Sequence, residues 1–173
     1  MTDQTLPLTT FYSGWGTYQK MFSEMLAPLT DKQLALPIGP GLHTVGEVAQ
    51  HVIANRVWWF QVWMGEGDPE LAPIAHWDPA DDVEVSPRSA AELVDGLDRT
   101  WTMIWDSLGR WTADDLDRVF QPPASLKEEE RGSFPPFSRR WIVWHVVEHE
   151  IHHGGELTLA LGEHGLTGIY AGM

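Results

Sequence analysis

Apolar side chains recur every three or four residues over four stretches of the chain, which is the spacing of an amphipathic helix. The first stretch covers Leu8–Leu26 and the second covers Thr44–Met64. The third covers approximately Pro87–Gly109, and the fourth begins at Arg139. The alternation of apolar and polar residues that marks a strand does not compete with these patterns. The chain is therefore predicted to be all-α.

Residues that cap helices stand at three of the predicted helix starts. Thr44 with Glu47, and Ser89 with Glu92, have the spacing of a capping box, in which each side chain accepts a hydrogen bond from the other residue's backbone. Ser138 is a suitable cap for the last helix. These caps favour starts at or near the positions that the apolar pattern gives.

The connections between the predicted helices differ in length. Gly65 and Gly67 end the second helix, and the Pro-, Asp- and Gly-rich residues that follow predict a long crossover to the third helix. The stretch 118–137 is irregular or a short hairpin. Four amphipathic helices with one long crossover predict a four-helix bundle, in which sites form between facing helices. The length and the even composition fit one domain over residues 1–173.

Charge excludes several classes of partner. The sequence has 25 acidic and 11 basic residues and a formal net charge of −14, so its surface is expected to repel nucleic acid and anionic lipid. It has neither an apolar run of about 18 residues nor a basic amphipathic stretch, which predicts no membrane partner. Met1–Pro7 lacks the features of a secretion signal, so a cytoplasmic location is expected. A small-molecule substrate fits these exclusions.

Histidines replace apolar residues on the face of the last predicted helix that should point into the bundle. His149 and His153 are four residues apart, so both imidazoles can bind one ion from neighbouring turns. His51 lies on the predicted buried face of the second helix and is a candidate third ligand. The chain has no cysteine, so nitrogen and oxygen are the ligand atoms on offer. Three nitrogens would leave one coordination position open for chemistry.

The remaining histidines are assigned less definite roles. A single histidine such as His51 is more often an ordinary polar residue than a ligand, and the cluster on the last helix is what favours a metal. His145 and His152 flank the predicted ligands and could be alternative ligands, hydrogen-bond partners of ligands or simple polar neighbours. Three further histidines lie near predicted turns and are expected to face solvent: His43, His76 and His164.

The segments Trp144–Leu157 and Val48–His51 resemble the DinB-like (DinB/YfiT-like) family of metal-binding proteins. The resemblance covers most of the chain and implies a four-helix bundle with a long crossover between its second and third helices. It also implies that the metal is held at the positions of His51, His149 and His153. The chain departs from the family at Gly154, where an arginine is usual. Two glycines in sequence there suggest a close backbone approach or a local kink.

The resemblance further implies an activity and a partner. Characterised relatives include transferases and isomerases that use a low-molecular-weight thiol, so a metal-dependent thiol transferase is the favoured function. A homodimer is implied as well, and the ten tryptophans agree with an interface. Imidazole ligands suit several divalent metals, with zinc or nickel favoured and iron or manganese left open. No side chain stands out as the general base; Glu47 and Glu148 are weak candidates.

Two other functions stay open at the level of sequence. His149-Glu150-x-x-His153 also fits the zinc peptidase pattern His-Glu-x-x-His, in which Glu150 would activate water. Only twenty residues follow His153, which leaves little room for the downstream ligand that such peptidases use. The third function is a non-catalytic bundle whose metal stabilises the fold or which binds a small molecule.

Overall fold

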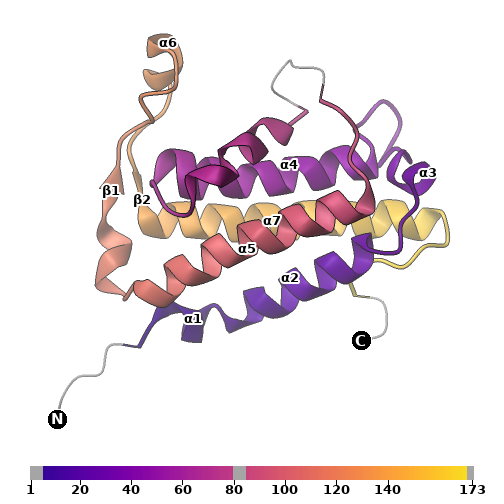
Figure 1. Ribbon diagram of the computed structural model, residues 1–173, viewed down its shortest axis with the longest axis horizontal. Helices are drawn as coiled ribbons and strands as arrows, with labels where there is room; N and C mark the ends of the chain where they lie inside the picture. The colour runs from indigo at the N-terminus through magenta and orange to yellow at the C-terminus, as the bar shows by residue number, and fades with distance from the viewer. Residues whose placement is uncertain (1–5, 80–84, 171–173) are drawn as a thin grey trace.

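The computed structural model describes residues 6–79 and 85–170, and over these residues the chain is mostly helical. The long helices lie side by side along the molecule (Figure 1). They are α2 (Ser13–Leu26), α4 (Val45–Val57), α5 (Ala90–Arg110) and α7 (Arg139–Glu163). Helix α4 packs against both α5 and α7, and α2 packs against α5. The prediction of a helical fold is confirmed.

The predicted caps define the helix starts. The Thr44 hydroxyl accepts a hydrogen bond from the Glu47 backbone N–H (3.2 Å), and the Glu47 carboxylate accepts one from the Thr44 N–H (2.7 Å). Ser89 and Glu92 form the same reciprocal pair before α5. Ser138 accepts from the backbone N–H of Trp141 before α7. All three capping predictions are confirmed.

Two predicted helices are interrupted. The first is divided at Tyr12 into α1 (Leu8–Phe11) and α2, because Tyr12 leaves the helical conformation (φ −93°, ψ 19°). The second continues from α4 into a π-helical segment, η1 (Trp58–Trp63). Short π segments are rare and are often found at functional sites. A further short helix, α3 (Asp31–Leu34), precedes α4.

The crossover between α4 and α5, which the sequence predicts to be a loop, contains a helix. This 3₁₀ helix, η2 (Pro69–Trp77), packs along α4 and buries Leu71 and Ile74. Those two apolar contacts explain why the segment is ordered despite its prolines. Asp78 follows η2 directly and is thereby placed beside α4. Residues 80–84 of the predicted crossover, like Met1–Thr5, lie outside the described residues.

The stretch before α7 forms a hairpin, which was one of its two predicted forms. Strands β1 (Val119–Phe120) and β2 (Phe137–Ser138) pair antiparallel, after the short helix η3 (Asp114–Asp117). The connection between the strands carries α6 (Glu128–Arg131) at a tip that projects beyond the long helices (Figure 1).

Among the described residues, none of the helices combines the length and the hydrophobicity that a membrane crossing requires.

Candidate metal centre

Three imidazoles from two helices meet between α4 and α7. His51 lies in the middle of α4, and His149 and His153 lie one turn apart in the middle of α7. Their potential ligand atoms all lie within 4.8 Å of one another, and the Nε2 atoms of His51 and His149 are 2.9 Å apart. The structure therefore brings together the three residues that the sequence predicts as ligands. Metal binding itself stays a prediction.

Two carboxylates fix the orientation of the outer two imidazoles. His51 Nδ1 lies 2.8 Å from an oxygen of Asp78, and His153 Nδ1 lies 2.7 Å from an oxygen of Glu156. An ionised carboxylate can only accept a hydrogen bond, so each Nδ1 carries the hydrogen and each Nε2 keeps a free lone pair. Carboxylates hold metal-binding histidines in this way in many metalloproteins.

His149, the central imidazole, is largely shielded from water. Burial, then the neighbouring His153 and His51, lower the pKa of His149 from 6.5 to about 3. Burial also lowers the pKa of His153. Both rings are therefore neutral near pH 7, which is the form that binds a metal. The Nδ1 atom of His149 is buried and has no hydrogen-bond partner among the described residues.

This donor set fits a divalent transition metal. In a tetrahedral site, two nitrogens bound at 2.0–2.1 Å lie about 3.3 Å apart, so only small side-chain movements separate the observed positions from ligation. Three neutral imidazoles are suitable ligands for zinc, nickel, iron and copper. Without an ion, the Nε2 atoms of His51 and His149, 2.9 Å apart, can share one hydrogen, which His149 would donate to His51.

The flanking histidines are outside this cluster. His145 stacks on Trp141, with ring centroids 4.8 Å apart, and its Nδ1 lies 3.0 Å from a Glu148 oxygen. His152 is exposed and pairs with Glu156 (3.2 Å), so Glu156 lies between His152 and His153. His145 is thus an aromatic neighbour, and His152 contacts the carboxylate that holds a predicted ligand. The three histidines assigned to solvent are exposed: His43, His76 and His164.

Glu150 does not fill the role that the peptidase pattern would give it. Its side chain is fully buried, and its two oxygens accept hydrogen bonds from Arg56 (2.6 and 2.9 Å) and one from the Trp15 indole (2.8 Å). Arg56, also fully buried, donates to Gln19 and to the backbone oxygen of Leu97. Because this carboxylate is held in a buried ion pair among the four long helices, it is not available as the water-activating base of the peptidase alternative.

Asp78 and Glu156 are the site residues to which the sequence pattern assigned no role. Glu156 follows His153 by three residues on the same helix face, so helical spacing could have identified it as a partner. Asp78 stands in the crossover, where no periodic pattern indicates a position in space. The two weak general-base candidates are engaged elsewhere: Glu47 caps α4, and Glu148 pairs with His145.

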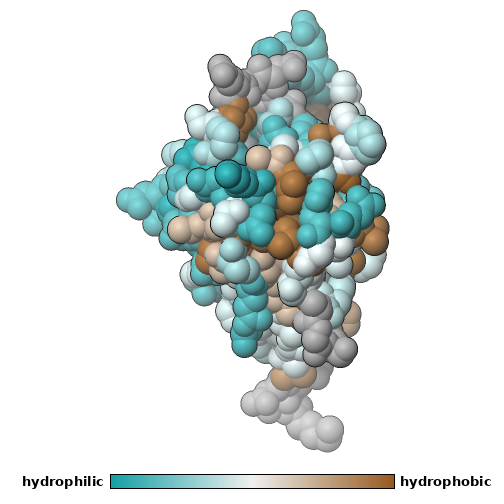
Figure 2. Space-filling view, turned by 90° about the vertical axis from the view of Figure 1, so that its right-hand side faces the viewer, coloured by the Kyte–Doolittle hydropathy of each residue, from teal (hydrophilic) through white to brown (hydrophobic). Residues whose placement is uncertain are grey.

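A cavity of about 230 Å³ gives access to the histidine cluster. Its wall includes His51 and His153, together with Ile38 and Leu42 from the loop before α4. Leu42 is 61% exposed, and apolar side chains lie among hydrophilic ones on the end of the molecule that carries α3 (Figure 2). A small molecule with an apolar part could therefore approach the imidazoles from this side.

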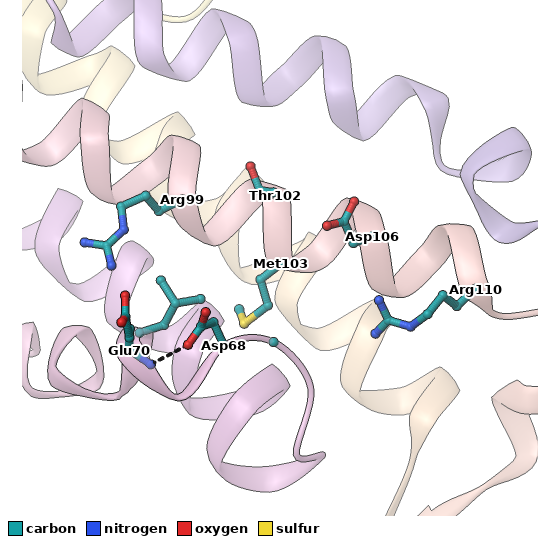
Figure 3. Close-up of a pocket in the computed structure, with 9 residues that line it drawn as sticks. Asp68, Glu70, Arg99, Thr102, Met103, Asp106 and Arg110 are labelled. Atoms are coloured by element: carbon teal, nitrogen blue, oxygen red, sulfur yellow. Dashed lines mark hydrogen bonds between the residues drawn. The ribbon is translucent and has the colours of Figure 1, made fainter.

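A second hollow, of about 340 Å³, lies between η2 and α5 and shares no residue with the histidine cluster (Figure 3). Arg99 and Arg110 alternate around it with Asp68, Glu70 and Asp106. Charges of both signs neutralise each other at short range, so this hollow has no marked preference for an ion of either sign.

Comparison with known proteins agrees with this architecture. A DinB-like protein from Bacillus cereus ATCC 10987 is 24% identical, with a TM-score of 0.65 over 95% of this chain and 97% of that one. A conserved protein from Enterococcus faecalis is 17% identical, with a TM-score of 0.62 over 91% of this chain and 99% of that one. No curated protein matches significantly. A family model described as the DinB superfamily matches residues 17–157, and the chain therefore belongs to the DinB superfamily.

Proposed function

We propose that this chain is a metal-dependent enzyme that transfers a low-molecular-weight thiol. In this proposal the four long helices form a four-helix bundle in one domain, with a divalent metal, zinc or nickel, bound by His51, His149 and His153. The observation that carries it is the pair of carboxylates, Asp78 and Glu156, that leave the Nε2 atoms of two neighbouring histidines free to bind. Proteins of this superfamily generally bind divalent metal ions.

Each residue of the site has a distinct task in this proposal. A bound divalent ion would supply a positive charge that lowers the pKa of a thiol or a water molecule at the open position. Asp78 and Glu156 orient the imidazoles of His51 and His153 and increase their basicity. Ile38 and Leu42 line the cavity beside the histidines and limit the access of bulk water to it.

Metal content and activity test the proposal separately. Purified wild-type protein is expected to hold one metal ion per chain by elemental mass spectrometry, and His149→Ala and His153→Ala are each expected to lose it. His164→Ala, which replaces an exposed histidine, is the matched control. Unchanged metal content in both cluster variants would contradict the ligand assignment.

Activity is measured with glutathione or cysteine as the thiol and chlorodinitrobenzene as the electrophile. We expect a rate above the uncatalysed reaction that chelation abolishes and added zinc or nickel restores. Metal bound with no such rate for any thiol or water nucleophile would favour a metal that only stabilises the fold.

Asp78→Asn is expected to weaken metal binding by about 10- to 100-fold, because the amide no longer fixes the His51 tautomer.

A further inference from the structure

A third cavity, of about 390 Å³, shares a lining residue, Asp78, with the cavity whose wall includes His51 and His153. Asp78 lines both cavities and lies 2.8 Å from His51 Nδ1. Asn55, one helical turn after His51 on α4, also lines it. The cavity is therefore directly adjacent to the histidine cluster, and its volume is in the range of small-molecule sites.

The wall of this cavity is assembled from segments that are distant in sequence. Trp58 comes from η1 and Ala75 from η2, whereas Leu126 and Phe134 come from the connection between β1 and β2. That connection rises at the same end of the molecule as the C-terminal end of α4 (Figure 1). An indole, a phenyl ring and aliphatic side chains give the cavity a largely apolar surface, which suits an aromatic or branched aliphatic group.

Asn55 is the polar residue that this surface leaves without a partner. The residue is 9% exposed, and its amide nitrogen is buried without a hydrogen-bond partner among the described residues. A buried donor without a partner costs free energy. The terminal amide turns easily about its last torsion, so its N–H can reach an oxygen placed in the cavity. A carbonyl or amide oxygen of a ligand would supply the missing acceptor.

Charge further restricts the ligand. The charged side chains that line the cavity among the described residues are Asp78 and Glu130, both acidic, and the whole chain has a net charge of −14. An anionic ligand would be repelled by both, whereas a neutral or cationic ligand would not.

We propose that this cavity binds a neutral or cationic small molecule that joins an aromatic or branched aliphatic group to a carbonyl or amide oxygen, with Asn55 as the donor to that oxygen. As the binding place of the substrate it deepens the proposed function and rests on it. Binding itself does not require the metal. Asp78, in contact with His51, would link occupation of this cavity to the histidine cluster.

The test uses isothermal titration of the full chain, both chelator-treated and metal-loaded, with three probes. Phenylalaninamide has the ring, the ammonium group and the amide oxygen; phenethylamine lacks the amide; 3-phenylpropionate is an anion. We expect phenylalaninamide to bind one per chain and at least tenfold more tightly than 3-phenylpropionate. No binding of phenylalaninamide at millimolar concentration, or equal binding of the anion, would overturn the proposal.

Two variants locate the binding. Asn55→Leu keeps the size of the side chain. It is expected to weaken the binding of phenylalaninamide by about tenfold and to change the binding of phenethylamine by less than about twofold. Phe134→Ala, at a residue that is 40% exposed, is expected to weaken the binding of both amines. Thr102→Ala, in the hollow of Figure 3, is the matched control and should change nothing. Unchanged phenylalaninamide binding in both cavity variants would contradict the assignment.

The outcomes separate the two proposals. If the chain binds no metal but phenylalaninamide still depends on Asn55, the cavity assignment holds and the metal function fails. If metal binding and thiol transfer are confirmed but none of the probes depends on Asn55 or Phe134, the cavity assignment fails alone.

Discussion

Gly154 of α7 lies against the side chain of Tyr18 from α2. A Cβ at this position would overlap the Tyr18 hydroxyl, which donates a 2.9 Å hydrogen bond to the backbone oxygen of Glu150. Of the two structural reasons that the sequence suggested for this glycine, the close approach is confirmed. The arginine usual in the resembling family cannot fit while Tyr18 occupies this position.

Substitution of the two neighbouring glycines should have opposite effects. Gly154→Ala is expected to lower the free energy of unfolding by about 1–3 kcal/mol, because the side chains of Tyr18 and Ile169 must move away from the new Cβ. Gly155→Ala places its Cβ where there is nothing within 4 Å and should raise the free energy by up to about 1 kcal/mol. Urea unfolding of both variants measures the difference; equal effects would show that the Tyr18 contact does not constrain α7.

The low pKa of His149 predicts acid sensitivity of the metal-free protein. The folded chain holds this imidazole neutral down to pH about 3, whereas the unfolded chain protonates it near its ordinary pKa of 6.5. The unfolded state therefore binds more protons between these pH values, so the free energy of unfolding should fall as pH decreases below 6.5. Urea unfolding of chelator-treated protein at pH 7.5 and 5 tests this. His149→Gln should show a smaller decrease; an identical decrease would assign the effect to other groups.

At the level of the helices, the Arg56–Glu150 pair connects the same two elements that carry the histidines. Arg56 follows His51 on α4, and Glu150 is the next residue after His149 on α7. Thr100 of α5 and Gln19 of α2 complete the hydrogen bonds of the guanidinium group. Each of the four long helices thus contributes to one buried polar cluster, which sets the rotation of α7 relative to α4.

Removal of one member of this pair should destabilise the fold more than removal of both. Glu150→Gln leaves the buried Arg56 charge without its counter-charge and is expected to cost about 3–5 kcal/mol of unfolding free energy. The double variant Arg56→Met/Glu150→Met should be clearly more stable than Glu150→Gln, because no charge remains buried. Denaturant unfolding provides the comparison. A double variant less stable than the single one would mean that the pair contributes mainly through its hydrogen bonds.

The elements differ in how well periodicity and capping predict them. The starts of α4, α5 and α7 follow from local hydrogen bonds at Thr44, Ser89 and Ser138, so sequence alone locates them. The four-residue spacing of His149 and His153 lies within one helix, so sequence alone predicts that these two side chains are neighbours. Asp78 is different, because its position depends on the packing of η2 against α4, a contact between residues distant in sequence. The role of Glu150 stayed open between two alternatives, because its pattern does not reveal the arginine on a neighbouring helix.

At the scale of the whole molecule, α7 leaves an apolar stripe uncovered. Trp144, Ile151 and Leu159 are 62%, 50% and 74% exposed, and at about 100° per residue they lie within roughly 80° of one another on the helix. Exposed apolar surface of this kind is typical of an interface. It supports the homodimer that the family resemblance implied, which stays a prediction.

Sedimentation velocity tests the dimer. The wild-type chain is expected to sediment as a dimer at micromolar concentration, and Leu159→Glu is expected to shift it towards monomer, because a charge would be buried at the interface. Leu42→Glu, at a side chain 61% exposed but outside the stripe, is the matched control. A monomeric wild-type chain, or dimers of equal strength in both variants, would contradict an interface on α7.

The crossover that carries Asp78 has a consequence for how long the histidine cluster stays assembled. Helix η2 is held to α4 mainly by side-chain packing, with Leu71 and Ile74 buried, and such a short segment can detach without the unfolding of α4. Each detachment would release the His51 ring to rotate, while the two rings on α7 stay in register. The lifetime of the complete cluster would then follow the amide hydrogen exchange of residues 69–77 rather than that of the long helices.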